Sequence, residues 1–187
     1  GQFAQASQLV AKGADPNCVM NCPDAKTLPV LFQLIKINNV KAVEYLLTLP
    51  TFDADLGTRC TLIQIVPQAE ANWTFTIASG TAPLMFAALS CVDKDLVILN
   101  ALLNCKRVNK NIKNDNSATP LHLAAGAMNL PAIQLLRTHG LSDGVLLGDE
   151  TPLMFGGRAN KEDSAAVQRL KDAFSKPLPS APPSPRG

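Results

Sequence analysis

Aromatic residues are scarce in this chain, which limits the kind of core it can build. Phe, Trp and Tyr make up 5% of the 187 residues, with one Trp and one Tyr. Leu, Ala and Val must therefore fill most of the buried volume, which favours small, closely packed helices.

An excess of one charge is also lacking. The 17 basic and 15 acidic residues give a net charge of +2, too even to predict binding to nucleic acid or an anionic membrane.

Long apolar runs are missing as well. No stretch approaches the roughly 18 uninterrupted apolar residues that a membrane span needs, so we expect no membrane partner. Because the charge is balanced, we expect no nucleic acid as partner either. No N-terminal signal peptide is visible, although the chain starts at Gly1 and could be a fragment of a longer protein.

Groups that could carry catalysis are few. His122 and His139 are the two histidines, and either could act as base to the thiol of Cys91 or Cys105. Both thiols, however, lie in or beside apolar segments, which disfavours an activated nucleophile. No Gly-rich phosphate loop with a following Lys-Ser/Thr pair is present, and the carboxylates are scattered. We therefore predict that the chain is not an enzyme, with no catalytic residues and no cofactor.

Cysteine is present in an odd number, which argues against a disulfide framework. The five residues are scattered among apolar neighbours, as expected for reduced thiols that pack as small hydrophobic side chains. Cys18 and Cys22 could supply two metal ligands, but no matching Cys/His pair follows, and we predict no metal site. Reduced thiols favour a cytoplasmic or nuclear location.

A repeated segment is the most informative feature of the sequence. Four heptapeptides align around Pro29, Pro83, Pro120 and Pro152, which are separated by 54, 37 and 32 residues. They read LPVLFQL, APLMFAA, TPLHLAA and TPLMFGG. Each is followed by a second segment with apolar residues at helical spacing, near residues 40–47, 96–103, 130–136 and 165–174. This pattern predicts pairs of helices that stack to bury a shared core.

The segment Thr119–Ala125 matches the Thr-Pro-Leu-His-x-Ala signature of ankyrin repeats at every fixed position. Ser7–Asn17 is similar to the end of an ankyrin second helix and its Gly-Ala-Asp-x-Asn turn, so we expect the chain to begin within a repeat. The chain thus resembles the ankyrin-repeat family, and the resemblance implies an all-α repeat solenoid of helix-turn-helix units.

The local chemistry of the motif is consistent with this fold. Thr119 and Thr151 precede a proline and can cap a helix in which that proline takes the first position. His122 can bridge neighbouring repeats through backbone and Thr hydroxyl groups. Ala124 and Ala125 are small enough to let two helices lie close together.

We predict an ankyrin-repeat domain over residues 1–174, with a partial repeat at 1–17 and repeats at about 23–57, 79–113, 114–146 and 147–174. In the second unit, Leu28 and Pro29 take the place of Thr-Pro. The last unit departs from the pattern at Gly156, Gly157 and 158–163, as a C-terminal cap would. Residues 175–187 form a Pro-rich tail, which is a disordered linker, a docking peptide for an aromatic groove, or a phosphorylation site at Ser184.

An insertion at about 58–78 separates the second and third repeats. Its flanks, 61–66 and 73–78, are rich in β-branched and aromatic residues that alternate with a period of two. We predict a β-hairpin with Trp73, Phe75 and Ile77 on one face. An isolated hairpin is marginal in water, so that face either packs on the neighbouring repeats or contacts a partner.

The ankyrin resemblance implies that a partner protein binds the concave surface of loops and inner helices. The implied contacts lie just before each Thr-Pro step and just after each inner helix. By matched position these are Ser79, Thr81, Leu89, Ser90, Asp115, Asn116, Ala118, Ala127, Met128, Leu147, Gly148, Glu150 and Arg158, to which we add Gln68, Glu70, Asn72 and Trp73 of the hairpin. Lys106, Arg107, Lys110 and Lys113 form either a solvated turn or a patch for an acidic partner.

We therefore predict a non-catalytic protein–protein interaction module, monomeric as this fragment. It would serve as a scaffold or as the targeting domain of a larger protein, such as a pathogen effector that acts inside a host cell. The alternative is a regulatory ankyrin domain within a multidomain enzyme. The identity of the partner does not follow from the sequence.

Overall fold

The structure is a computed structural model that describes residues 12, 14–17, 19–21, 27–58, 62–67, 72–90 and 96–177. The side chains of residues 19–21, 27–28, 62–67 and 72–77 lie outside this description. So do most of the predicted partial repeat 1–17 and residues 178–187 of the predicted tail. Of the five cysteines, Cys105 falls within the described ranges and carries a free thiol.

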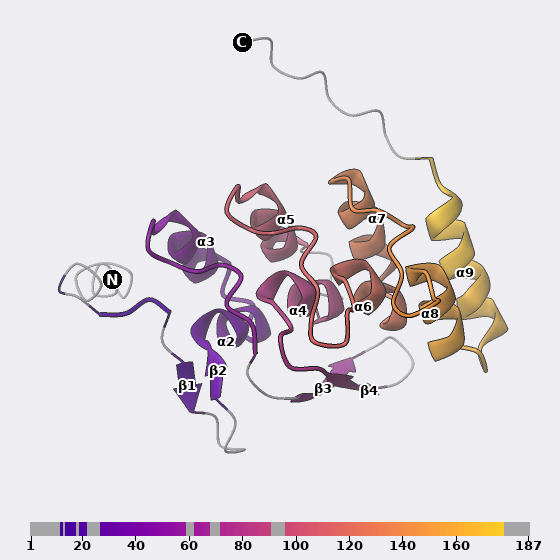
Figure 1. Cartoon of the computed structure of the whole chain (residues 1–187), viewed down its shortest axis with the longest axis horizontal. Helices are drawn as coiled ribbons and strands as arrows, with labels where there is room; N and C mark the ends of the chain where they lie inside the picture. The colour runs from indigo at the N-terminus through magenta and orange to yellow at the C-terminus, as the bar shows by residue number, and fades with distance from the viewer. Residues whose placement is uncertain are drawn as a thin grey trace, which may run out of the picture.

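The fold is all-α in its core, with eight helices in the described part of the chain arranged in two rows (Figure 1). The inner row contains α2 (Val30–Lys36), α4 (Pro83–Ser90), α6 (Pro120–Gly126) and α8 (Pro152–Ala159). The outer row contains α3 (Val40–Thr48), α5 (Val97–Asn104), α7 (Leu130–Thr138) and α9 (Ser164–Ser175). Each inner helix contacts the outer helix that follows it, and each helix contacts the next member of its row.

The helix starts follow from local capping chemistry. The hydroxyl of Thr119 accepts from the backbone N–H of His122, and that of Thr151 accepts from the N–H of Met154. The outer helices begin differently, because the side chains of Asn39, Asn129 and Asp163 accept from the N–H three residues later. These caps satisfy backbone donors that a helix leaves free in its first turn.

Small residues set the distance between the inner helices. Ala87, Ala88, Ala124 and Ala125 are fully buried, and their short side chains let α4, α6 and α8 approach closely. Leucines and isoleucines of the outer helices, such as Leu99, Leu102, Ile133 and Leu136, fill the space between the two rows. One continuous core therefore runs along the stack.

The first helix of the second unit, α2, begins one residue later than the alignment of the prolines predicts. Pro29 was aligned with Pro120, but α2 starts at Val30, so Val30 corresponds to Pro120 and Pro29 occupies the N-cap position of Thr119. Proline has no side-chain acceptor, and α2 has no side-chain cap. The proline was a misleading marker of register, because in α2 it lies at the N-cap and not at the first helical position that proline prefers.

Two antiparallel strand pairs lie on the far side of the inner row from the outer helices (Figure 1). β3 (Leu62–Pro67) pairs with β4 (Asn72–Ile77), with Leu62 opposite Ile77 and Pro67 opposite Asn72. β1 (Val19–Asn21) pairs with β2 (Thr27–Pro29). The sequence pattern did not predict β1 and β2, because three residues are too few for a period of two to be recognised.

Candidate functional site

Loops that precede the inner helices are joined to one another by backbone hydrogen bonds. The N–H of Thr58 donates to the carbonyl of Thr81 at 3.0 Å, and the N–H of Gly80 donates to that of Thr58 at 2.8 Å. The N–H of Asp115 donates to the carbonyl of Ser79 at 3.0 Å. Gly80 has φ 76°, and a Cβ there would meet the backbone and side chain of Asp115. These bonds join the loop before α4 to the segment at Thr58 and to the loop before α6.

A buried asparagine fixes the turn that presents the predicted contacts of the fourth unit. The side-chain oxygen of Asn114 accepts from the N–H groups of Asn116 and Ala118, and its amide donates to the hydroxyl of Thr81 at 3.3 Å. Ser117 has φ 64°, so the chain turns sharply after Asn116. Asp115 and Asn116 are consequently exposed at the tip of a rigid turn.

His122 joins the fourth unit to the fifth. The N–H of Thr119 donates to Nδ1 at 3.3 Å, which requires a lone pair there and places the ring proton on Nε2, 3.3 Å from the carbonyl oxygen of Glu150. Burial lowers the pKa of His122, an effect that the Glu150 carbonyl opposes and the charge of Lys113 reinforces. The predicted bridging role of His122 agrees with this geometry, and the ring is neutral at neutral pH.

Acidification is therefore expected to destabilise the domain. The unfolded chain takes up a proton on this histidine near pH 6.5, whereas the folded chain does so only at lower pH, so stability falls as the pH drops below about 6.5. Burial and the charge of Lys110 lower the pKa of His139, which acts in the same direction. The urea midpoint should fall between about pH 7.5 and 5.5, and less steeply in His122→Gln than in His139→Gln. Equal slopes in the two variants would contradict this assignment.

One face of α8 carries exposed groups next to the 139–151 loop. Met154 and Arg158 are one helical turn apart, and Met154 is 55% exposed. Arg158 donates to both carboxylate oxygens of Glu150, at 2.6 and 2.9 Å, and its guanidinium lies over the Phe155 ring, 5.3 Å from the centroid. The hydrogen bond from Arg158 lowers the pKa of the Glu150 carboxyl. The exposed side chain of Met154 thus lies one helical turn from the ion pair between Arg158 and Glu150.

The predicted contact residues fall into four groups, which are exposed, half-buried, buried, or without a described side chain. Asp115, Asn116, Gly148 and Arg158 are exposed, whereas Ser79, Ser90, Met128, Leu147 and Glu150 are half-buried. Asn72 and Trp73 lie in β4, where the backbone alone is described, and Gln68 and Glu70 lie outside the described residues. The structure brings Leu147, Glu150 and Arg158 together, since the backbones of Leu147 and Glu150 form an isolated β-bridge.

Four predicted contacts are buried, and their prediction as contact residues is wrong. Thr81, Leu89, Ala118 and Ala127 are at most 4% exposed. The hydroxyl of Thr81 donates to the carbonyl of Ala78, and the other three side chains belong to the core. Transfer by matched position failed here because it takes no account of how closely neighbouring loops and helices pack.

Sequence reasoning missed the exposed apolar residues Ile37, Val97, Leu146 and Met154, and the contacts that one exposed arginine makes with another unit. Leu146 and Met154 are at least half exposed, yet each looks like a core residue in the apolar pattern. The guanidinium of Arg107 donates to the carbonyls of Leu47 and Phe52, both at 2.6 Å. It therefore joins the second unit to the third from an exposed turn.

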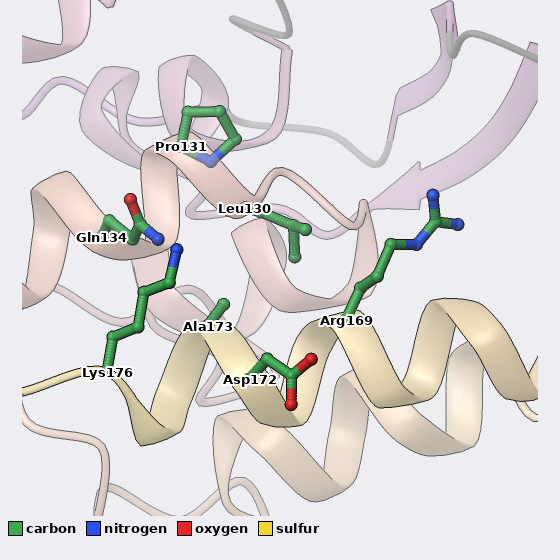
Figure 2. A pocket seen from close by; sticks show the side chains of 7 residues that line it. All are labelled: Leu130, Pro131, Gln134, Arg169, Asp172, Ala173 and Lys176. Carbon is green, nitrogen blue, oxygen red and sulfur yellow. The ribbon is translucent and has the colours of Figure 1, made fainter.

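A groove lies between α7 and α9, on the outer row (Figure 2). Its volume is about 360 Å³, and it is lined by Leu130, Pro131, Gln134, Arg169, Asp172, Ala173 and Lys176. Leu130 and Ala173 lie in the middle of the view, and Lys176 and Gln134 extend toward one another. None of the predicted contacts lines this groove, so it is separate from the surface of loops and inner helices.

Within the described ranges, no cluster of three or more His, Cys, Asp or Glu side chains is arranged to hold a metal ion. No helix in those same ranges combines the length and apolar character needed to cross a membrane. A scan against protein-family models finds no match to this chain, and a search of curated proteins finds no significant similarity.

Proposed function

We propose that this chain is an ankyrin-repeat module that binds another protein through the loops and inner helices, and that it is not an enzyme. The Thr-Pro-Leu-His motif at Thr119 and the stacked pairs of short helices support the ankyrin assignment. In this proposal the inserted strands β3 and β4, which carry Trp73, extend the binding surface.

The observation that carries the proposal is the exposed face of α8. Interfaces are anchored by apolar and arginine side chains that are held in place before binding, because less conformational entropy is then lost. Met154 offers exposed apolar surface, and the contacts of Arg158 with Glu150 and Phe155 hold its guanidinium in a fixed position. The turn before α6 adds Asp115 and Asn116 as exposed polar groups of the same proposed surface.

A pair of matched substitutions tests this surface. Met154→Asp places a carboxylate on the inner row, and Val97→Asp does the same on the outer row. Both side chains are exposed, at 55% and 42%, and both lie in the first turn of a helix, where an aspartate is tolerated. We expect both variants to keep the helical circular-dichroism signal of the wild-type chain.

The readout is chemical crosslinking in cell extract, followed by quantitative mass spectrometry of the proteins attached to the purified chain. We expect a partner that wild type and Val97→Asp recover equally and that Met154→Asp recovers at least about tenfold less, a loss of about 1.4 kcal/mol in binding. Equal recovery by all three chains, or a selective loss with Val97→Asp, would refute binding through the inner row.

A further inference from the structure

A small hollow, here called the loop hollow, lies between the 105–119 loop and the 139–151 loop. Its volume is about 140 Å³. Buried Thr119, Leu121 and Leu141 contribute apolar atoms to its wall. The remaining lining residues are Lys110, Asn111, Lys113, Ser142 and Val145.

The two lysines of the loop hollow, Lys110 and Lys113, form no ion pair within the described part of the chain. Of the carboxylates in the two loops, Asp143 pairs with Arg137 and Glu150 pairs with Arg158. The described ion pairs include neither Asp115 nor Asp149.

The positive charges of Lys110 and Lys113 also affect two nearby histidines. The charge of Lys110 contributes to the lowered pKa of His139, and that of Lys113 contributes to the lowered pKa of His122. A negatively charged group would therefore be favoured at the rim, where Lys113 is exposed.

The size of the loop hollow limits what can enter it. Binding sites for small molecules usually have volumes of about 300–1,000 Å³, well above the 140 Å³ found here. A volume several times the roughly 30 Å³ of one water molecule suits a single aliphatic side chain. Leu121, Leu141 and Val145 would contact such a side chain. Lys110 and Lys113 would contact the residues that flank it in the partner.

We propose that the loop hollow receives one aliphatic side chain of an acidic peptide segment, with Lys110 and Lys113 contacting carboxylates on either side of it. This inference rests on the proposed function and specifies the chemistry of the partner. It also gives a role to part of the basic cluster in the sequence, whose Arg107 is used to join two units.

Peptide titration of the full 187-residue, ¹⁵N-labelled chain tests the proposal by NMR. The probe is acetyl-Glu-Glu-Leu-Glu-Glu-amide, and the controls replace its leucine with glycine or its glutamates with lysines. We expect the probe to shift the amides of Asn111, Ser142 and Val145 with a Kd of about 1 mM or tighter. Both control peptides should bind at least about tenfold more weakly.

Charge reversal on the protein supplies the matched control. Lys110→Glu/Lys113→Glu should weaken probe binding by at least about tenfold, whereas Lys161→Glu/Lys171→Glu, which makes the same change in net charge at two exposed positions, should not. Absence of saturable shifts, shifts confined to other loops, or equal binding of the glycine peptide would overturn the inference.

This outcome is separable from the test of the proposed function. If the probe fails to bind but partner recovery still depends on Met154, only the peptide chemistry is wrong. If the probe binds as expected but Met154→Asp leaves recovery unchanged, the loop hollow stands and binding through α8 does not.

Discussion

Replacing Gly156 with alanine is expected to lower the free energy of unfolding by about 3 kcal/mol, at the upper end of the usual range for overpacking. A Cβ at this position would lie 2.8 Å from the carbonyl oxygen of Ala125 and 2.7 Å from the side chain of Leu170. The Ala125 atoms are backbone of the neighbouring helix α6, which cannot move without disturbing the stack. Since Leu170 is fully buried, it has little room to yield.

The prediction is unusual because alanine is the residue found at the equivalent position of two other units. Ala87 and Ala124 occupy the fifth residue of α4 and α6, as Gly156 does in α8. A substitution toward the repeat pattern, from glycine to alanine within a helix, would ordinarily stabilise. Here the close approach of α8 to α6 reverses the sign.

Gly157 provides the matched control. It lies in the same helix, and a Cβ there would meet nothing within 4 Å. Gly157→Ala should therefore raise stability by about 0.5–1 kcal/mol, the usual gain on replacing a helical glycine. Urea denaturation followed by far-UV circular dichroism measures both variants. If the two alanine variants have the same midpoint, α8 does not lie this close to α6.

Features governed by local chemistry could be predicted from the sequence. The helix starts at Pro83, Pro120 and Pro152 follow from the preference of proline for the first helical position. The contact of His122 with Thr119 could be predicted as well, because the two are three residues apart, whereas the carbonyl of Glu150 that completes the bridge is 28 residues away. The start of α2 was misplaced by one residue, since Pro29 lies at the N-cap and not at the first helical position that proline prefers.

Features that depend on contacts between distant residues could not be predicted. Ala118 and Ala127 were predicted as partner contacts by matched position, but neighbouring elements bury them. The close approach at Gly156 likewise depends on Ala125 and Leu170, which are distant positions in the sequence. Gly156 and Gly157 look equivalent in the sequence, and they differ only in how closely neighbouring atoms pack against them.

Arg137 is a second residue whose role depends on distant contacts. Its position in an amphipathic helix resembles that of an ordinary surface residue. The side chain is nevertheless buried, and its Nε donates to both oxygens of Asp143, at 2.9 and 3.1 Å. Its Nη1 donates to the carbonyls of Ala173 and Lys176, at 2.9 and 3.1 Å. These two carbonyls lie at the C-terminal end of α9, where a helix leaves acceptors free. One arginine thus fastens the last helix to α7.

Arg137→Ala is expected to cost about 3 kcal/mol, because it leaves the buried carbonyl of Ala173 unpaired, removes the hydrogen bonds to Lys176 and Asp143, and removes the packing of the side chain against Phe174. Arg137→Met keeps much of the apolar stem and should recover only part of that loss. Arg169→Ala is the matched control. Its ion pair with Asp163 is 3.8 Å long and exposed, so its removal should cost no more than about 0.5 kcal/mol.

Amide hydrogen exchange distinguishes this role from a general loss of stability. If Arg137 fastens α9, the amides of α9 should exchange faster in Arg137→Ala than those of α4 and α6, because contacts at the end of a stack affect the terminal unit first. Uniform acceleration along all four inner helices would indicate that Arg137 supports the whole domain instead. Unchanged exchange in α9 would mean that Ala173 and Lys176 do not depend on the guanidinium for their hydrogen bonds.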